Sequence, residues 1–256
     1  MSSGPASPHR HRLRPASGAA VQPPGPAGRA DGRGMVQLLA GVLLAACVLA
    51  FGAVAKAGPV AGLDLRVDEH IAAHDRTGAL TALAKAATEA AKPETVGVAL
   101  MIAVPLILLV ARRRADAVRV LCMFGGAFAL AEIGKKLIGE HRPPASLQAM
   151  AADSSPSYPS GHAAAAVLAV SLAVIAVAAA WRYAAVVLGG LYAVAVAASR
   201  VYLGDHYPLD IIGGMLCALA AGLIVTGLAR LPPVQDRLRK LDAPRRPAAP
   251  PGPPVG

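Results

Sequence analysis

The chain has 256 residues, of which 55% are hydrophobic and only 16% are charged, against about 25% charged residues in an average soluble domain. The hydrophobic residues gather in stretches of about 20, the length that an α-helix needs to cross a bilayer. This pattern excludes an ordinary soluble globular protein, a disulfide-rich secreted module and a wholly disordered chain. Aromatic residues make up only 4%, so the expected helices consist mainly of small and aliphatic residues, which pack closely in membranes.

The net charge is +10, from 25 lysines and arginines against 15 aspartates and glutamates. In a soluble protein this excess would suggest nucleic-acid binding, but here most of it lies in the two terminal segments. Basic flanks of apolar helices are the usual signal of a cytoplasmic end. We therefore expect membrane lipids, and no nucleic acid, as partners.

Both ends of the chain are low in complexity and rich in proline and arginine. Such segments bury too little apolar surface to fold, so we expect residues 1–34 and 231–256 to be disordered cytoplasmic tails. Residues 35–230 then form one all-α membrane domain, a bundle of six transmembrane helices. The expected spans cover about residues 36–55, 95–111, 118–138, 162–181, 183–200 and 208–229. The first could instead be a secretory signal cleaved after Ala55, but its long basic leader and its length favour a retained helix.

The connections between the spans differ in charge. Arginines dominate residues 112–119 and mark the short link at Arg182, whereas residues 56–92 carry equal numbers of basic and acidic side chains. The positive-inside rule therefore places both tails in the cytoplasm and residues 56–93, 139–161 and 201–207 outside a multi-pass plasma-membrane protein. Residues 64–92 are polar and rich in alanine, and we expect one or two amphipathic helices there, on the outer surface.

No metal site is evident. Cys47, Cys122 and Cys217 lie in apolar stretches without the spacing of a metal site, and we interpret them as small buried hydrophobic residues. His70 and His74 are one helical turn apart and could share a metal, but no third ligand accompanies them. We expect neither a metal nor a cofactor.

Lys135 and Arg142 form the first of three polar clusters at the outer ends of spans. They are seven residues apart, so both can face one side of a helix that continues to Pro143. Ionisable groups next to a span are functional candidates, although snorkelling of the long side chains to the interface would explain them equally well.

The second cluster is the run from Ser157 to His162. Ser160 and Gly161 would open a helix whose free N–H groups bind an anion, and His162 just inside could donate a proton to it. The alternative is a capped helix start with a chance histidine.

The third cluster contains Arg200, His206 and Asp210. Asp210 is one helical turn beyond His206, so its carboxylate can orient one ring nitrogen and make the other more nucleophilic. Arg200 offers a planar fork suited to phosphate oxygens. Alone, this cluster could equally be a structural histidine–aspartate pair. The three clusters together favour metal-free phosphoryl transfer, in which positioning and charge stabilisation do most of the catalysis.

The pattern Lys135-x6-Arg142-Pro143, then Pro159-Ser160-Gly161-His162, then Ser199-Arg200-x5-His206-x3-Asp210 resembles the type 2 phosphatidic acid phosphatase family. This family shares its phosphate pocket with vanadium-dependent haloperoxidases and soluble bacterial acid phosphatases. The resemblance covers about residues 36–230 and implies a six-helix membrane phosphatase. It implies that His206 attacks phosphorus and becomes phosphohistidine, that Asp210 orients it and that His162 protonates the leaving oxygen. The implied phosphate-binding residues are Lys135, Arg142, Ser160, Gly161 and Arg200.

The favoured function is therefore hydrolysis of a phosphorylated lipid at the outer face of the plasma membrane. Members of similar size often act on undecaprenyl diphosphate, which is our first choice of substrate. Phosphatidic acid and phosphatidylglycerophosphate are alternatives within the same class. A vanadate-binding haloperoxidase is a remote alternative, because six long spans do not suit it, and a transporter or scaffold without catalysis would not need His162, His206 and Asp210.

Overall fold

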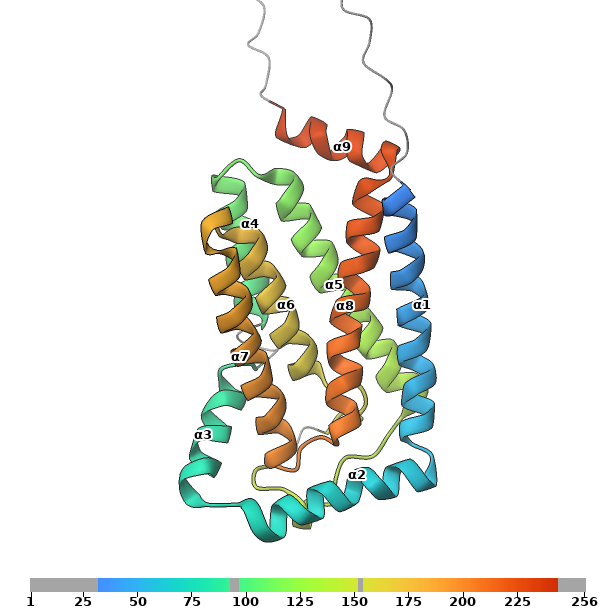
Figure 1. The fold of residues 1–256 in the computed structure, drawn as a ribbon, viewed down its shortest axis with the longest axis vertical. Helices are drawn as coiled ribbons and strands as arrows, with labels where there is room; N and C mark the ends of the chain where they lie inside the picture. Colours follow the sequence, from blue (N-terminus) through green and yellow to red (C-terminus); the bar gives the residue numbers. More distant parts are fainter. Residues whose placement is uncertain (1–31, 93–96, 152–153, 244–256) are drawn as a thin grey trace, which may run out of the picture.

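The computed structural model describes residues 32–92, 97–151 and 154–243, and within these ranges the regular structure is entirely helical. Figure 1 shows long helices running side by side, with shorter helices across the two ends. The helices are α1 (Gly32–Ala55), α2 (Gly58–His70), α3 (Gly78–Glu89), α4 (Val98–Val110), α5 (Arg114–Ile138), α6 (Gly161–Ala176), α7 (Arg182–Tyr202), α8 (Pro208–Arg230) and α9 (Pro232–Asp242).

Four of the helices are long and apolar enough to cross a membrane: α1, α5, α7 with the turn before it, and α8. The other two apolar helices, α4 and α6, have 13 and 16 residues, fewer than the roughly 20 that a perpendicular span needs. Large apolar side chains such as Leu43, Val110 and Leu188 are exposed on the outside of the bundle, as expected of surfaces that face lipid. The chain is therefore an all-helical membrane protein with four candidate spans in the described residues.

Close packing of small residues holds the bundle together. α1 packs along α8, α6 along α7, and α5 lies against both α6 and α8. Ala127 of α5 meets Leu168 of α6 and Ala218 of α8 in one buried cluster. Cys217 is buried as expected, but Cys47 and Cys122 are exposed, because they lie on helix faces that look away from the bundle.

The polar helices lie across the ends. Figure 1 shows α2 crossing the end of the bundle opposite α9, while α3 lies beside the lower part of α7. The prediction of helices within residues 64–92 is confirmed, with a short π-helical turn at Ile71–Asp75 joining α2 and α3.

The prediction of a disordered tail from residue 231 is wrong as far as residue 242, because α9 occupies this stretch. Two prolines open this helix, where their missing N–H groups cost nothing. Its Leu238 is buried against Ala115 and Ala229, and the Asp242 carboxylate accepts a hydrogen bond from the N–H of Ala115 (3.1 Å). Residues 1–31 and 244–256, the rest of both expected tails, lie outside the described residues.

α5 ends at Ile138, where the span over residues 118–138 was expected to end, and Gly139 there adopts a left-handed conformation (φ 58°) that glycine adopts without strain. The helix therefore does not continue to Arg142 and Pro143. The end of α6 differs from the prediction. α6 ends at Ala176 rather than at residue 181. The guanidinium group of Arg113 donates to the carbonyl oxygens of Ile175 and Ala176, which satisfies the end of the helix at that point.

Candidate active site

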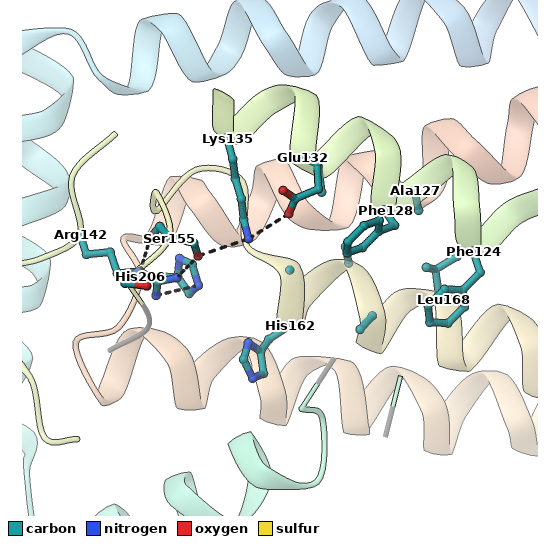
Figure 2. A pocket seen from close by; sticks show the side chains of 15 residues that line it. Phe124, Ala127, Phe128, Glu132, Lys135, Arg142, Ser155, His162, Leu168 and His206 are labelled. Atoms are coloured by element: carbon teal, nitrogen blue, oxygen red, sulfur yellow. Dashed lines mark hydrogen bonds and ion pairs between the residues drawn. The ribbon is translucent and has the colours of Figure 1, made fainter. Parts of the chain in front are cut away.

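A cavity of about 410 Å³ lies between α5 and α6, at the end of the bundle that α2 covers. Figure 2 shows its two different ends. One end is polar, and the other is lined by Phe124, Phe128 and Leu168. The polar residues that line it are Glu132, Lys135, Arg142, Ser154, Ser155, His162 and His206. Three separate chain segments therefore bring their polar side chains to one site.

His206 lies in the short link between α7 and α8 and is 1% exposed. Its Nε2 is 3.4 Å from Nη1 of Arg142, and its Nδ1 is 3.3 Å from Oδ2 of Asp210. A guanidinium group can only donate hydrogen bonds, so Nε2 must be the accepting nitrogen and Nδ1 carries the proton. The predicted pairing with Asp210 is thus present, and the lone pair of Nε2 faces the Arg142 side of the cavity.

Burial lowers the pKa of His206 to about 4, although the hydrogen bond that His206 donates to Asp210 opposes this shift. Desolvation disfavours the imidazolium form, and the nearby Arg142 and Arg200 disfavour it further. The ring is consequently neutral at physiological pH, which is the state that a nucleophile or a base requires.

Asp210 is held by more than its histidine. It is fully buried in the first turn of α8, and its Oδ2 accepts hydrogen bonds from the N–H of Tyr207 (2.9 Å) and from Oγ of Ser157 (2.5 Å). Ser157 Oγ also lies 3.3 Å from Nδ1 of His206. Sequence reasoning gave Ser157 no role, because nothing in the sequence indicates that the loop before α6 folds back onto α8.

The two predicted cations at the end of α5 do reach the cavity, through different structures. Lys135 lies in the last turn of α5, with its Nζ 3.4 Å from both Glu132 Oε1 and Ser155 Oγ. Arg142 lies in the loop after the helix. It donates to the carbonyl oxygens of Ser155 and Asp205, both at 2.9 Å, so its guanidinium plane is fixed beside His206. Ser155 is a second residue that the sequence did not single out.

The start of α6 carries the second cluster. Ser160 is the N-cap, and its Oγ accepts a hydrogen bond from the N–H of Ala163 (3.4 Å). Ser160 is fully buried and does not line the cavity, whereas Gly161 and His162 do. Nε2 of His162 is buried and has no hydrogen-bond partner in the described part of the chain. Figure 2 shows this ring apart from the hydrogen-bonded group around Arg142 and His206.

Arg200 is 2% exposed in the last turn of α7 and does not line the cavity. Its Nη1 forms an ion pair with Oδ2 of Asp205 at 3.0 Å. Because Asp205 directly precedes His206, this pair lies immediately behind the site. Arg200 is close enough for its charge to act on His206. The structure therefore gathers all eight predicted residues in one region, of which Ser160, Arg200 and Asp210 are set back from the cavity wall.

The remaining candidate, the His70–His74 pair, lies apart from the cavity. The two rings stack with centroids 4.6 Å apart, and Nδ1 of His74 lies 3.1 Å from the carbonyl oxygen of His70. Across the described ranges, no group of three or more histidine, cysteine, aspartate or glutamate side chains is arranged to hold a metal ion.

Residues 116–231 match the PAP2 superfamily. The sequence of this stretch is similar to that superfamily. The match runs from α5 to α8 and contains every residue of the site described above. This similarity supports a phosphatase.

A solved structure supports the fold over a longer stretch of the chain. A transmembrane PAP2-type phosphatidylglycerolphosphate phosphatase from Bacillus subtilis aligns with a TM-score of 0.61 and 23% sequence identity. The alignment covers 76% of this chain and 94% of the Bacillus chain. No curated protein matches the sequence.

Proposed function

We propose that the chain hydrolyses the phosphate monoester or diphosphate of a membrane lipid through a phosphohistidine intermediate. One observation carries this proposal. The same cavity holds the reactive nitrogen of His206 among cations at one end and the apolar side chains of Phe124, Phe128 and Leu168 at the other. A phosphorylated lipid has these two chemical halves.

In the first step, Nε2 of His206 attacks phosphorus and the bond from phosphorus to the lipid oxygen breaks. Asp210 holds the proton on Nδ1 and stabilises the imidazolium that forms. His162, protonated in the complex with the anionic phosphate, gives its proton to the departing oxygen, so the lipid leaves as a neutral alcohol or, from a diphosphate, as a monophosphate. Lys135 and Arg142 neutralise the phosphoryl oxygens, together with the N–H groups at Gly161 and the start of α6.

In the second step, water attacks the phosphorus atom of the phosphohistidine. His162, now neutral, takes a proton from this water, and the bond between nitrogen and phosphorus breaks. Inorganic phosphate leaves, and both histidines return to their starting states. We also assign Ser160 and Arg200 to phosphate binding. The ion pair between Arg200 and Asp205 holds the guanidinium group in place behind the cavity wall.

The first choice of substrate is undecaprenyl diphosphate or another polyprenyl diphosphate. Phosphatidylglycerophosphate is the second candidate, supported by the structural similarity to the phosphatidylglycerolphosphate phosphatase from Bacillus subtilis. Phosphatidic acid is a further alternative. The apolar end of the cavity lies between two apolar helices and suits any of these lipid tails, so the headgroup must decide among them.

We further propose six spans, with α4 and α6 crossing as shorter segments beside the four long helices. Basic side chains at the α9 end of the bundle, such as Arg112, Arg114, Arg237 and Arg239, support a cytoplasmic location for this end. Both termini are then cytoplasmic, and the cavity opens near the extracytoplasmic face of the plasma membrane.

The test is phosphate release by purified protein in detergent. The panel contains a polyprenyl diphosphate, phosphatidylglycerophosphate, phosphatidic acid and a water-soluble phosphate ester, each with His206→Ala as the inactive control. We expect a lipid to be preferred over the soluble ester and the polyprenyl diphosphate to have the highest kcat/KM. Equal activity on the soluble ester would contradict a lipid substrate, and a preference for phosphatidylglycerophosphate would replace the first choice with the second.

A further inference from the structure

The buried carboxyl oxygens that have no hydrogen-bond donor in the described residues include Oδ1 of Asp210 and Oε2 of Glu140. The donors that hold Asp210, namely Ser157, Tyr207 and His206, all point at its other oxygen, Oδ2. A buried carboxylate oxygen without a donor is costly. The two unsatisfied oxygens therefore need a common explanation.

Glu140 lies directly behind the site. It follows Gly139 in the loop after α5 and is 6% exposed, and its carbonyl oxygen accepts a hydrogen bond from the N–H of Ser157 (2.9 Å). This bond ties Glu140 to the serine that holds Asp210. The carboxyl of Glu140 is within hydrogen-bonding reach of Asp210. Two carboxylates can only accept, so a bond between them requires one proton.

Glu140 is the better place for this proton. Burial, the charge of Asp210 and the contact with Asp210 raise the pKa of Glu140 to about 8. Asp210 already accepts hydrogen bonds on Oδ2 from Ser157 and Tyr207, so it is suited to be the acceptor. A shared proton therefore resides on Glu140 and satisfies both orphaned oxygens with a single hydrogen bond.

We propose that Glu140 is a positioning residue, which stays protonated and donates a hydrogen bond from Oε2 to Oδ1 of Asp210. This inference rests on the proposed role of Asp210 in orienting His206. With both oxygens held, the Asp210 carboxylate cannot rotate, and Oδ2 stays aimed at Nδ1 of His206. Ionisation of Glu140 would place a second negative charge against Asp210, push the carboxylate away and loosen the imidazole.

Other titratable groups lie near the Glu140–Asp210 pair and influence its titration. They are Asp64 and Asp68 of α2, Lys56 in the link after α1, and Tyr158 and Tyr207 in the flanking loops. Asp68 is the main rival, because burial raises its pKa to about 8 as well. A decrease in activity above this pH could therefore come from either residue, and the experiment must separate them.

The experiment compares the pH dependence of kcat/KM for the full chain and four variants on the best lipid substrate. The wild type should lose activity as pH rises through about 8. Glu140→Gln should lack this alkaline limb, because an amide N–H donates to Asp210 at every pH. Glu140→Ala should be less active at all pH values, by roughly tenfold or more for one charge-assisted hydrogen bond, and should lack the limb too. Asp68→Asn should keep the limb.

The fourth variant, Glu69→Gln, makes the same chemical change at an exposed position of α2 and should match the wild type. Persistence of the alkaline limb in Glu140→Gln, or its loss in Asp68→Asn alone, would overturn the assignment. An activity-independent measurement is infrared difference spectroscopy between about pH 6 and about pH 10. In the wild type, the band of a protonated carboxylic acid should be present at the lower pH. The band should be lost in Glu140→Gln and kept in Asp68→Asn. An unchanged band in Glu140→Gln would contradict the proposal.

The two proposals fail in different ways. If no phosphorylated lipid is hydrolysed, the proposed function fails, and the infrared band still reports on the proton of Glu140. If lipid hydrolysis needs His206 but Glu140→Gln leaves the alkaline limb unchanged, the function stands and the role of Glu140 falls.

Discussion

The substitution Gly214→Ala should damage the site from within α8, at a residue that does not itself line the cavity. A Cβ atom built at Gly214 would lie 2.2 Å from the carbonyl oxygen of Ser160 and 3.1 Å from Cβ of Ala163. The nearest atom belongs to the backbone, so no flexible side chain can yield. The start of α6 must retreat by about 1 Å before the contact becomes an ordinary one.

This displacement would move two residues of the proposed mechanism, Ser160 and His162. The N–H of Ser160 donates to the carbonyl oxygen of Asp210 (3.0 Å), and His162 follows two residues later. A misplacement of about 1 Å in a catalytic group can reduce the rate by about 10²-fold. Overpacking of a tight contact also costs about 1–3 kcal/mol of folding stability. We therefore expect kcat/KM to fall by one to two orders of magnitude, with a modest decrease in Tm.

The matched control is Gly222→Ala, two turns further along the same helix. A Cβ atom there meets only Cε of Met123 at 3.5 Å, an ordinary contact, and alanine favours a helix by about 1 kcal/mol over glycine. This variant should keep its activity and be as stable as the wild type or more so. Activity and thermal unfolding of both variants are measured in the same detergent. A Gly214→Ala enzyme with unchanged kcat/KM would refute the close contact between α8 and the start of α6.

Three further predictions concern chemistry and topology. Loss of a general acid should reduce the activity of His162→Ala on lipid phosphates by about 10²–10⁴-fold, and much of the activity should return with an activated aryl phosphate as substrate. His206→Ala should stay inactive on both substrates. The opposite pattern would exchange the roles of the two histidines. Excess EDTA should leave most activity intact and vanadate should inhibit, whereas activity lost on chelation and restored by Mg²⁺ would point to a metal. A cysteine at Glu69 should react with an impermeant thiol reagent outside intact cells and one at Asp236 should not, with reversed labelling placing the site inside.

The parts of the site that depend on residues close together in the sequence could be predicted. Asp210 lies four residues beyond His206, and the expected contact between Oδ2 and Nδ1 is present at 3.3 Å. The helix start at Ser160 could be predicted equally well, because a serine followed by glycine and an apolar run is a common N-terminus. Local geometry is enough for such contacts, since few residues separate the partners.

Contacts across elements could not be predicted in this way. Ser157 and Ser155 lie in a loop with little regular structure, and they reach Asp210 and Arg142 only because the loop folds against α8. Glu140 was not singled out, because nothing in its sequence context indicates that it lies beside Asp210. The helix α9 was missed because the composition of its stretch suggests disorder. What holds it is the contact of Leu238 with Ala115 and Ala229, and Ala115 is far away in the sequence.

The loop before α6 needs an anchor, since it holds Ser155 and Ser157 without a helix of its own. Tyr158 supplies it. This side chain is fully buried, donates a hydrogen bond to the carbonyl oxygen of Val48 in α1 (2.6 Å) and packs against Cys217 of α8. Its ring is thus fixed between two membrane helices, with the adjacent Ser157 directed at Asp210. The geometry of the His206–Asp210 pair therefore depends on α1, a helix that contributes no residue to the cavity.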